Sequence, residues 1–503
     1  MLKIGWSKRD VSTDKPVMIT GQMHTRISKG VADPILLNCL LIEDEHDIAI
    51  FLSGDFVNGY GVLDTIRTKV NALRPEIPAK KILFNVTHTH CGPKISNECP
   101  YEQVPHDGVE IFSPDEYRQY MTDMAAEAVV EAYDTRQEGA ITYGYGYAVV
   151  SHSRRTVYFD DFSKRPQFSN EPKSLYVHGH AVMYGNTNDD QFSGYEGGAD
   201  HYVNLMYTFD KNKKLTGAVI NIPCPSQNSE MEEILTSDYW HDVRQILQQK
   251  YGDIGILPQC AAAGDLAPRI LHYNKAEQRR FELKYADTKI DSAYTIPNEK
   301  LRRLDIAQRI CEAFDEVLSW AGNDLIYDAE VKHSVRNIPL PRRLVSEDLY
   351  QDACAELAKL EAAGFVKTDN PETDYFHNTI HMSGMSRYKD IIQRYQDQQT
   401  DPNTFVELHT IKIGDIAFAS NPFELYIDYQ HRIQARSPFT QTFIVQLCAK
   451  PDGNFSAGYL ATERAVKNVG YSAAIYDNQV SPKGGDTLVE QTLQDLFKLY
   501  TDN

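Results

Sequence analysis

The chain has 503 residues, of which 51 are Lys or Arg and 70 are Asp or Glu, so its formal net charge is −19. Such an acidic chain argues against nucleic acid as the main partner, because phosphate groups would repel it. Hydrophobic residues at 42% and charged residues at 24% argue against wholesale disorder and are typical of a globular protein.

No Gly/Ser-rich linker, charge block or internal repeat divides the sequence, so we expect a single domain over residues 1–503. The N-terminus lacks the apolar core of a signal peptide, and no run of about 18 apolar residues occurs. We therefore expect a soluble protein without a transmembrane segment, either cytoplasmic or exported with its signal peptide already removed. The sequence leaves the oligomeric state open.

Apolar runs of strand length alternate with helical patterns, which predicts an α/β fold of layered mixed β-sheets flanked by helices. The expected strands are Leu36–Ile42, Ile48–Ser53, Lys81–Val86, Thr216–Ile222, Ile254–Leu257, Ile411–Ala419 and Thr442–Leu447. The expected helices are Asp115–Ala132, Trp240–Lys250, Asn298–Trp320, Glu347–Ala363 and Pro422–Ala435. Residues 139–200 are rich in Gly, Tyr, Ser, Asn and Asp, so we expect strands and long loops that frame a substrate.

Four of the predicted strands end in polar segments that contain His, Cys, Asp or Glu. These segments are 87–93, 223–226, 259–265 and 421–424. Ligands of α/β proteins collect at the carboxyl ends of strands, because the loops there are not needed for core packing. The four segments therefore predict one common crevice.

The strongest local signal is His88-Thr89-His90, directly after the strand at 81–86. If the extended geometry continues, residues two apart face the same side, so both imidazoles can converge on one cation or substrate group. The alternative is a pair of surface or capping histidines. Gln22, His24 and Arg26 form a further polar cluster that either reaches the crevice or caps a loop.

The segment Asn421-Pro422-Phe423-Glu424 is typical of a helix start, with an N-cap, a proline and a first-turn carboxylate. Glu424 then either contributes its carboxylate to the crevice or complements the helix dipole. Other histidines in loop-like stretches are alternative ligands or solvated side chains: His178, His180, His201, His377 and His381.

Eight cysteines are scattered without a Cys-x-x-Cys pair, at positions 39, 91, 99, 224, 260, 311, 354 and 448. This low density does not support a disulfide framework. We expect most of them to be buried thiols.

Taken in order, the motifs resemble the neutral (alkaline, non-lysosomal) ceramidase family over about residues 18–471. The series is Thr-His-Thr-His-x-Gly-Pro at 87–93, Cys224-Pro225, Ser237-Asp238, Gly264-Asp265-Leu266-Ala267-Pro268, 421–426 and Gly458-Tyr459. Too few residues follow Tyr459 for the C-terminal immunoglobulin-like domain that many members carry, so the resemblance implies the catalytic domain alone.

The resemblance implies a zinc (Zn²⁺) amidase. His88, Glu424 and Tyr459 correspond to metal ligands of the family. His90 resembles the histidine that contacts the scissile carbonyl, and Tyr471 and Arg154 resemble groups on the substrate side, so these three are expected to bind and polarise the substrate.

Two positions depart from the family. Cys224 stands where the family has its second zinc-binding histidine; a thiolate is also a zinc ligand, and His241 is the fallback donor. Ala267 stands where the family has its active-site serine. A methyl group cannot attack a carbonyl, so we expect a metal-activated water as nucleophile. Asp265 is then the candidate proton acceptor, or else it only caps a turn.

The predicted function is a zinc-dependent hydrolase that cleaves an amide (N-acyl) or related bond in a small-molecule, lipid-like or glycan-derived substrate, which need not be ceramide. Two alternatives remain open. One is a metal-dependent enzyme that acts on a glycan or ester linkage. The other is a catalytically lapsed binding protein of the same fold.

Overall fold

The computed structural model describes residues 1–96, 100–166, 177–451 and 457–501. Its centre is an eight-stranded sheet in the order β14-β13-β12-β7-β1-β4-β5-β6. The strands are β1 (Lys3–Asp10), β4 (Leu36–Glu43), β5 (Ile48–Gly54), β6 (Ile82–Val86), β7 (Gln137–Tyr147), β12 (Tyr202–Asp210), β13 (Leu215–Ile222) and β14 (Gly255–Cys260). Most neighbours are antiparallel, whereas β5 with β6 and β13 with β14 are parallel.

A second sheet, in the order β16-β17-β18-β20, packs against one face of the first. Its strands are β16 (Val331–Pro341), β17 (Asn403–Ile413), β18 (Ile416–Ser420) and β20 (Gln441–Val445). Buried side chains of both sheets, among them Phe51, Phe418 and Phe443, share one apolar core between them. The expectation of layered mixed sheets is confirmed.

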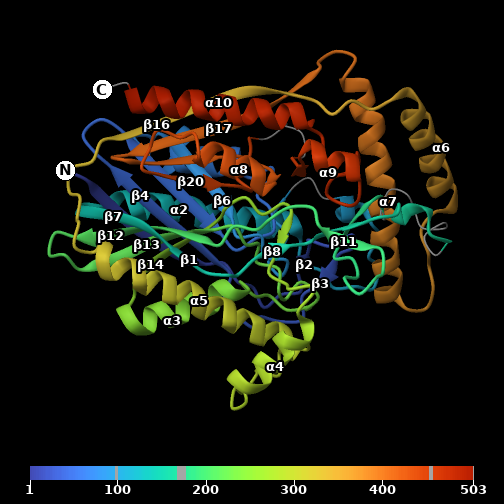
Figure 1. Ribbon diagram of the computed structural model, residues 1–503, viewed down its shortest axis with the longest axis horizontal. Coiled ribbons are helices and arrows are strands. Elements are labelled where there is room, and N and C mark those ends of the chain that lie inside the picture. The colour runs from blue at the N-terminus through green and yellow to red at the C-terminus, as the bar shows by residue number, and fades with distance from the viewer. Residues whose placement is uncertain (97–99, 167–176, 452–456, 502–503) are drawn as a thin grey trace.

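Helices cover the outer face of each sheet, which gives a four-layer α/β/β/α arrangement (Figure 1). The larger sheet is covered by α1 (Leu63–Leu73), α2 (Pro114–Asp134), α3 (Tyr239–Tyr251) and α5 (Pro297–Ala321). The smaller sheet is covered by α8 (Ile427–Gln434) and α10 (Pro482–Thr501). The other helices are α4 (Asn274–Lys284), α6 (Glu347–Ala363), α7 (Pro371–Asp397) and α9 (Glu463–Asn468).

The helices begin where the sequence provides caps. Ser113 accepts a hydrogen bond from the Glu116 N–H at the start of α2, and Ser346 does the same for Leu349 in α6. α5 begins at Pro297, whose missing N–H costs nothing at a first helical position. These helices and α3 lie within a few residues of their predicted bounds, but α1, α7 and α10 are not among the predicted helices.

Two predicted elements are wrong in detail. The strand expected over 411–419 is the end of β17 and the start of β18, because Gly414, with φ of 59°, turns the chain between them. The helix expected from Pro422 begins only at Ile427. Residues 424–425 instead form the short strand β19 (Glu424–Leu425), which pairs in parallel with β21 (Tyr459–Leu460).

The described residues of 137–200 form β7, a central strand of the large sheet, and several short strands joined by loops. Short strands in and around this region are β8 (His152–Ser153), β9 (Arg155–Tyr158), β10 (Ala181–Met183), β11 (Phe192–Tyr195) and β15 (Leu266–Ala267). A further short pair joins β2 (Met18–Ile19) to β3 (Arg26–Ile27). The expected mixture of strands and loops is confirmed for the described part of this segment.

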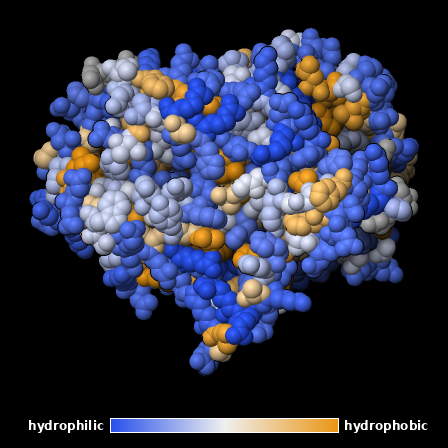
Figure 2. All heavy atoms as spheres, in the orientation of Figure 1, coloured by the Kyte–Doolittle hydropathy of each residue, from blue (hydrophilic) through white to orange (hydrophobic). Residues whose placement is uncertain are grey.

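Seven cysteines lie in the described residues, and none of these seven forms a disulfide. Six of them are buried, as predicted; Cys99 lies outside the described residues. Among the described helices, none is both long and apolar enough to cross a bilayer. Figure 2 shows a mainly hydrophilic face with small apolar patches.

A buried ion network fixes the segment 223–238 to α5. The Arg303 guanidinium donates to Asp33 at 2.8 Å, to Asp242 at 3.2 Å and to the Thr236 hydroxyl at 3.0 Å. Removing one partner of a buried ion pair leaves the other charge uncompensated, which is costly. Arg303 therefore stabilises the segment that carries Glu230 to the crevice.

We predict that Arg303→Met lowers the free energy of unfolding by about 3–5 kcal/mol, because Asp33 stays buried without the guanidinium charge and Asp242 keeps only its pair with Lys300. Urea unfolding followed by circular dichroism measures this. Arg436→Met is the matched control, because Arg436 pairs with Glu490 at the surface and should change stability little. Equal effects of the two substitutions would contradict the prediction.

Candidate active site

A cavity of about 520 Å³ lies where the polar segments after β5, β6, β13 and β18 meet. Eight of the candidate side chains named from the sequence line it: Gln22, His88, His90, Arg154, His178, Glu424, Tyr459 and Tyr471. Two of the four predicted segments, 87–93 and 421–424, contribute to its lining, whereas 223–226 stops just before the lining residue Gln227 and no residue of 259–265 lines it. The predicted common crevice is therefore present in part. Val57, Val182 and Met183 add apolar surface to the same walls.

His88 presents its Nε2 to the cavity in a defined tautomer. Its Nδ1–H donates to the Val57 carbonyl at 2.8 Å, so in the neutral ring Nε2 carries the lone pair. The backbone at His88 has φ of 64°, so the expected continuation of extended geometry is wrong. The two histidines converge because the chain turns at His88.

His90 is buried next to His88 and to an acidic side chain. The two Nε2 atoms are 3.3 Å apart, and His90 Nδ1 is 3.6 Å from Glu230 Oε2. Burial, together with nearby His88, holds the pKa of His90 well below its usual value. The ring is therefore neutral at physiological pH.

The pairing of β19 with β21 places Glu424 beside Tyr459. Glu424 Oε2 lies 3.5 Å from His88 Nε2. Burial, together with the charge of Glu424, raises the pKa of the Tyr459 phenol well above its usual value. Glu424 is thus directed to the cavity by a strand pair and not by a helix start.

Arg154 joins the acidic and phenolic groups of this wall. One guanidinium nitrogen donates to the Gly264 carbonyl at 2.9 Å and to the Tyr459 hydroxyl at 3.3 Å, and it lies 3.5 Å from Glu424 Oε2. Tyr471 packs edge-to-face against Tyr459 with ring centroids 5.7 Å apart. The wall therefore holds a fixed positive charge and two phenols.

Cys224 precedes the cavity-lining Gln227 by three residues, but its own thiol does not line the cavity. The fully buried Sγ lies 3.3 Å from the Val150 carbonyl, within the core between the large sheet and α3 and α5. Burial also raises the pKa of the Cys224 thiol well above its usual value, which opposes the thiolate that a metal would need.

His241 and Asp265 also lie away from the cavity walls. His241 lines a different cavity, and its Nε2 is 3.3 Å from Asp33 Oδ1. Asp265 Oδ1 accepts the Ile427 N–H at 3.0 Å, at the start of α8, so it caps that helix. The backbone carbonyl of Asp265 also accepts the Arg154 N–H at 3.1 Å.

Glu230 is the main residue that the sequence analysis does not single out. Its carboxylate pairs with Arg269 at 2.7 Å and accepts from Gln22 Nε2 at 3.2 Å, next to His90. No local motif marks Glu230, because it lies in a turn-rich segment far from His90 in sequence. Gln22 does reach the crevice, whereas Arg26 is buried and donates to the carbonyls of Glu232 and His90.

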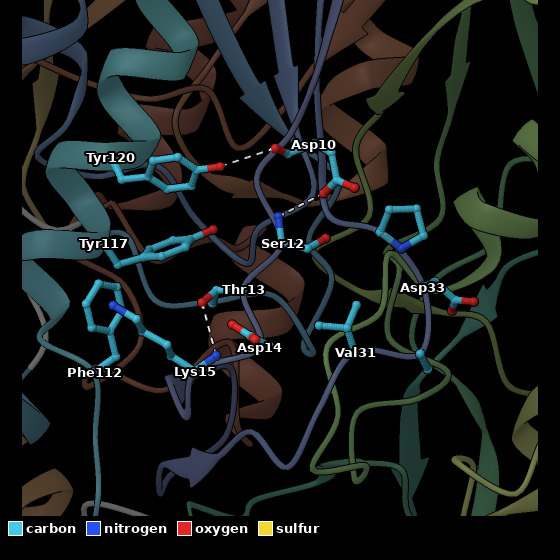
Figure 3. Close-up of a pocket in the computed structure, with 12 residues that line it drawn as sticks. Asp10, Ser12, Thr13, Asp14, Lys15, Val31, Asp33, Phe112, Tyr117 and Tyr120 are labelled. Atoms are coloured by element: carbon cyan, nitrogen blue, oxygen red, sulfur yellow. Dashed lines mark hydrogen bonds between the residues drawn. The ribbon is translucent and has the colours of Figure 1, made fainter.

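A larger cavity, of about 690 Å³, lies elsewhere and is shown in Figure 3. Its polar groups are engaged locally: Asp10 accepts from the Ser12 N–H, and the Tyr117 hydroxyl donates to the Val11 carbonyl. No histidine or cysteine is among its lining residues within the described chain. The chemistry is therefore concentrated in the smaller cavity around His88.

The donors around His88 favour a cation. His88 Nε2 and Glu424 Oε2 lie 3.5 Å apart, and both are acceptors when the His88 ring is neutral. Within the described residues no three His, Cys, Asp or Glu side chains are grouped so that they could hold a metal ion by themselves. The nitrogen, carboxylate and phenol donors of His88, Glu424 and Tyr459 nevertheless fit the ligand chemistry of zinc.

No protein-family model matches the chain, and no curated protein matches its sequence. Solved structures do share its fold. The neutral ceramidase from Pseudomonas aeruginosa superposes with a TM-score of 0.63 at 14% identity, over 99% of this chain and 74% of that chain. A structure described as ceramidase complexed with C2 gives the same score and identity over 75% of its chain. The ceramidase-like fold is thus confirmed.

Gly264 permits the close approach of β19. A Cβ at this position would lie 2.3 Å from the Glu424 carbonyl oxygen and 2.7 Å from its carbon. We predict that Gly264→Ala displaces Glu424 and lowers the free energy of unfolding by about 1–3 kcal/mol. Gly198→Ala is the control, because nothing lies within 4 Å of its added Cβ. Calorimetric melting of both variants measures the effect. A Gly264→Ala protein with the stability of the wild type would contradict the prediction.

Burial raises the pKa of Asp265 to about 6. A raised carboxyl pKa contributes stability that is complete below the unfolded pKa of about 3.9 and is lost as the pH rises through about 6. Asp265→Asn keeps the acceptor for Ile427 but cannot ionise. We predict that its stability relative to wild type increases by up to about 3 kcal/mol between pH 4 and pH 7. Urea unfolding of the wild type and of Asp265→Asn over this pH range measures the difference, and Asp107→Asn, at an exposed aspartate, is the control. If the stability of Asp265→Asn and of the wild type changed in parallel with pH, the prediction would be refuted.

Proposed function

We propose that this protein is a zinc-dependent hydrolase that cleaves an amide (N-acyl) or related bond in a small molecule. The observation that carries the proposal is the arrangement of His88 Nε2 opposite Glu424 Oε2, in a cavity that also presents Arg154 and two phenols. The similarity of the fold to neutral ceramidases supports hydrolysis as the reaction class. We propose family membership on the same grounds.

His88, Glu424 and Tyr459 are the proposed metal donors of this cavity. When bound, zinc would supply the Lewis acidity that makes water nucleophilic near neutral pH. The Val57 carbonyl holds the His88 ring in the tautomer that binds a metal through Nε2. The pairing of β19 with β21 holds Glu424 and Tyr459 in place before any ligand arrives.

Arg154 and Tyr471 are the proposed substrate-binding groups. Both can donate hydrogen bonds to a carbonyl oxygen on which negative charge develops during attack. Arg154 is fixed by the Gly264 carbonyl and by Tyr184, so its charge is already oriented. Ala267 is fully buried on β15 and offers only a methyl group, which supports attack by water without an acyl-enzyme.

The substrate should combine an apolar part with a polar head. Val57, Val182 and Met183 line the cavity together with Arg154, Gln227 and Glu230. This mixture suits lipid-like and glycan-derived N-acyl compounds of small size. A buried charged wall does not suit a purely hydrocarbon ligand.

The test is metal analysis of protein purified without a His-tag, followed by turnover of a panel of N-acyl amides, esters and glycosides. We expect about one zinc per chain and cleavage of N-acyl amides that a chelator abolishes and zinc restores. Zinc without turnover on any substrate would favour the binding-protein alternative. Cleavage of esters or glycosides alone would show that the enzyme acts on an ester or glycosidic bond and not on an amide.

We predict that Tyr471→Phe lowers kcat by about 10²–10³ and leaves the zinc content unchanged, because only a hydroxyl donor to the substrate is lost. Steady-state kinetics and elemental analysis of the same preparation measure both quantities. Tyr500→Phe, at an exposed tyrosine of α10, is the matched control. Loss of zinc from Tyr471→Phe would show that this phenol belongs to the metal site.

A further inference from the structure

Another cavity, of about 490 Å³, lies between α5 and the end of β7 and shares no lining residue with the cavity around His88. Its walls consist of three aromatic and two acidic side chains together with Ala313: Tyr145, Tyr147, Trp320, Glu312 and Glu316. The side chains of Tyr145, Tyr147 and Trp320 are 49%, 66% and 48% exposed. Exposed aromatic side chains gathered around a hollow are typical of binding sites.

Two glycines of β7 let α5 approach closely enough to border this cavity. A Cβ on Gly144 would lie 2.3 Å from Trp320 Cη2, and a Cβ on Gly146 would lie 3.1 Å from Ala313 Cβ. A glycine inside a strand often marks such a close approach. The tyrosines that alternate with these glycines and the exposed side chains of α5 therefore line one hollow.

The acidic side chains of the cavity have no counter-charge. Glu312, Glu316 and Trp320 follow one another at four-residue spacing, so they lie on one face of α5. Like charges at this spacing destabilise a helix. In the described part of the chain neither glutamate forms an ion pair, because no Lys or Arg lines the cavity and Arg309, one turn earlier on α5, pairs with Asp305. A bound cation would remove this repulsion.

The aromatic rings form a corner and not a flat platform. The ring plane of Tyr145 is inclined by 87° to that of Tyr147 and by 77° to that of Tyr202, which lies opposite Tyr147 on β12. The Trp320 indole N–H donates to Glu316 Oε1 at 2.9 Å, so a carboxylate adds negative charge to the type of ring that binds cations best. Inclined, electron-rich rings beside carboxylates are the arrangement of the aromatic cages that bind ammonium groups.

We infer that this cavity is a binding site for a small organic cation, an ammonium group that carries apolar substituents. The rings attract the charge through their faces and contact the substituents, and Glu312 and Glu316 neutralise the charge. The net charge of −19 also attracts cations to the protein as a whole. A neutral ligand would leave both carboxylates uncompensated, and an anion would be repelled. The inference does not depend on the proposed function, because the two cavities are separate.

The experiment uses choline as the probe and dimethylbutanol, in which carbon replaces the charged nitrogen, as its uncharged control. Isothermal titration calorimetry of the full chain at low salt measures both affinities. We expect a choline Kd on the order of 1 mM and binding of the alcohol that is at least about tenfold weaker. Equal affinities for the two probes would overturn the inference without the use of any variant. Binding of phosphatidylcholine vesicles without binding of free choline would overturn it too, since the site would then belong to a membrane surface.

Substitutions test whether choline binds at this cavity. Tyr147→Ala should weaken choline binding by about 2–5-fold, and the double variant Glu312→Gln/Glu316→Gln should weaken it by about tenfold. Tyr273→Ala and Glu282→Gln are the matched controls, because both positions are exposed and neither lines the cavity. A wild-type choline Kd in the double glutamine variant would show that choline binds elsewhere and would overturn the inference.

Discussion

The parallel pairing of β19 with β21 is the contact on which the site depends. It sets Glu424 beside Tyr459, although Glu424 follows β18 and Tyr459 follows β20. Gln446 secures the pair by accepting from the N–H groups of Leu425 and Ala263. Gly264 then lets the neighbouring loop pass against the Glu424 backbone without a clash. A shift of this small unit would move the carboxylate, the phenol and Arg154 together.

Buried charge is the second constraint, and the fold satisfies it with pairs. Arg154 is set between Glu424, Tyr459 and the Gly264 carbonyl, and Arg269 balances Glu230. Such pairs contribute little net stability, because desolvation offsets attraction, but they fix orientation. The polar cavity at the strand ends therefore stays preorganised. The same logic explains why Arg303 holds the segment that carries Glu230.

Much of the framework follows from local pattern. Apolar runs predicted most of the described sheet strands that end at the cavity, and Ser and Pro caps marked α2, α5 and α6. The rule that ligands collect at strand ends correctly brought His88 and Glu424 to one crevice. The helix start expected at Pro422 failed because a two-residue strand pairing there outweighs the capping signal.

From the sequence by itself, the strand-end pattern brought His88, His90 and Glu424 to one crevice, and the family resemblance added Arg154 and Tyr459; all five line the cavity. Only the tertiary structure decided where each group points. The turn at His88 directs both imidazoles toward the cavity, and core packing turns the Cys224 thiol away from it. The Asp265 carboxylate accepts a hydrogen bond at the start of α8 and so does not reach the cavity. Glu230 meets His90 across a long stretch of chain. Side-chain direction depends on such distant contacts, which no local pattern encodes.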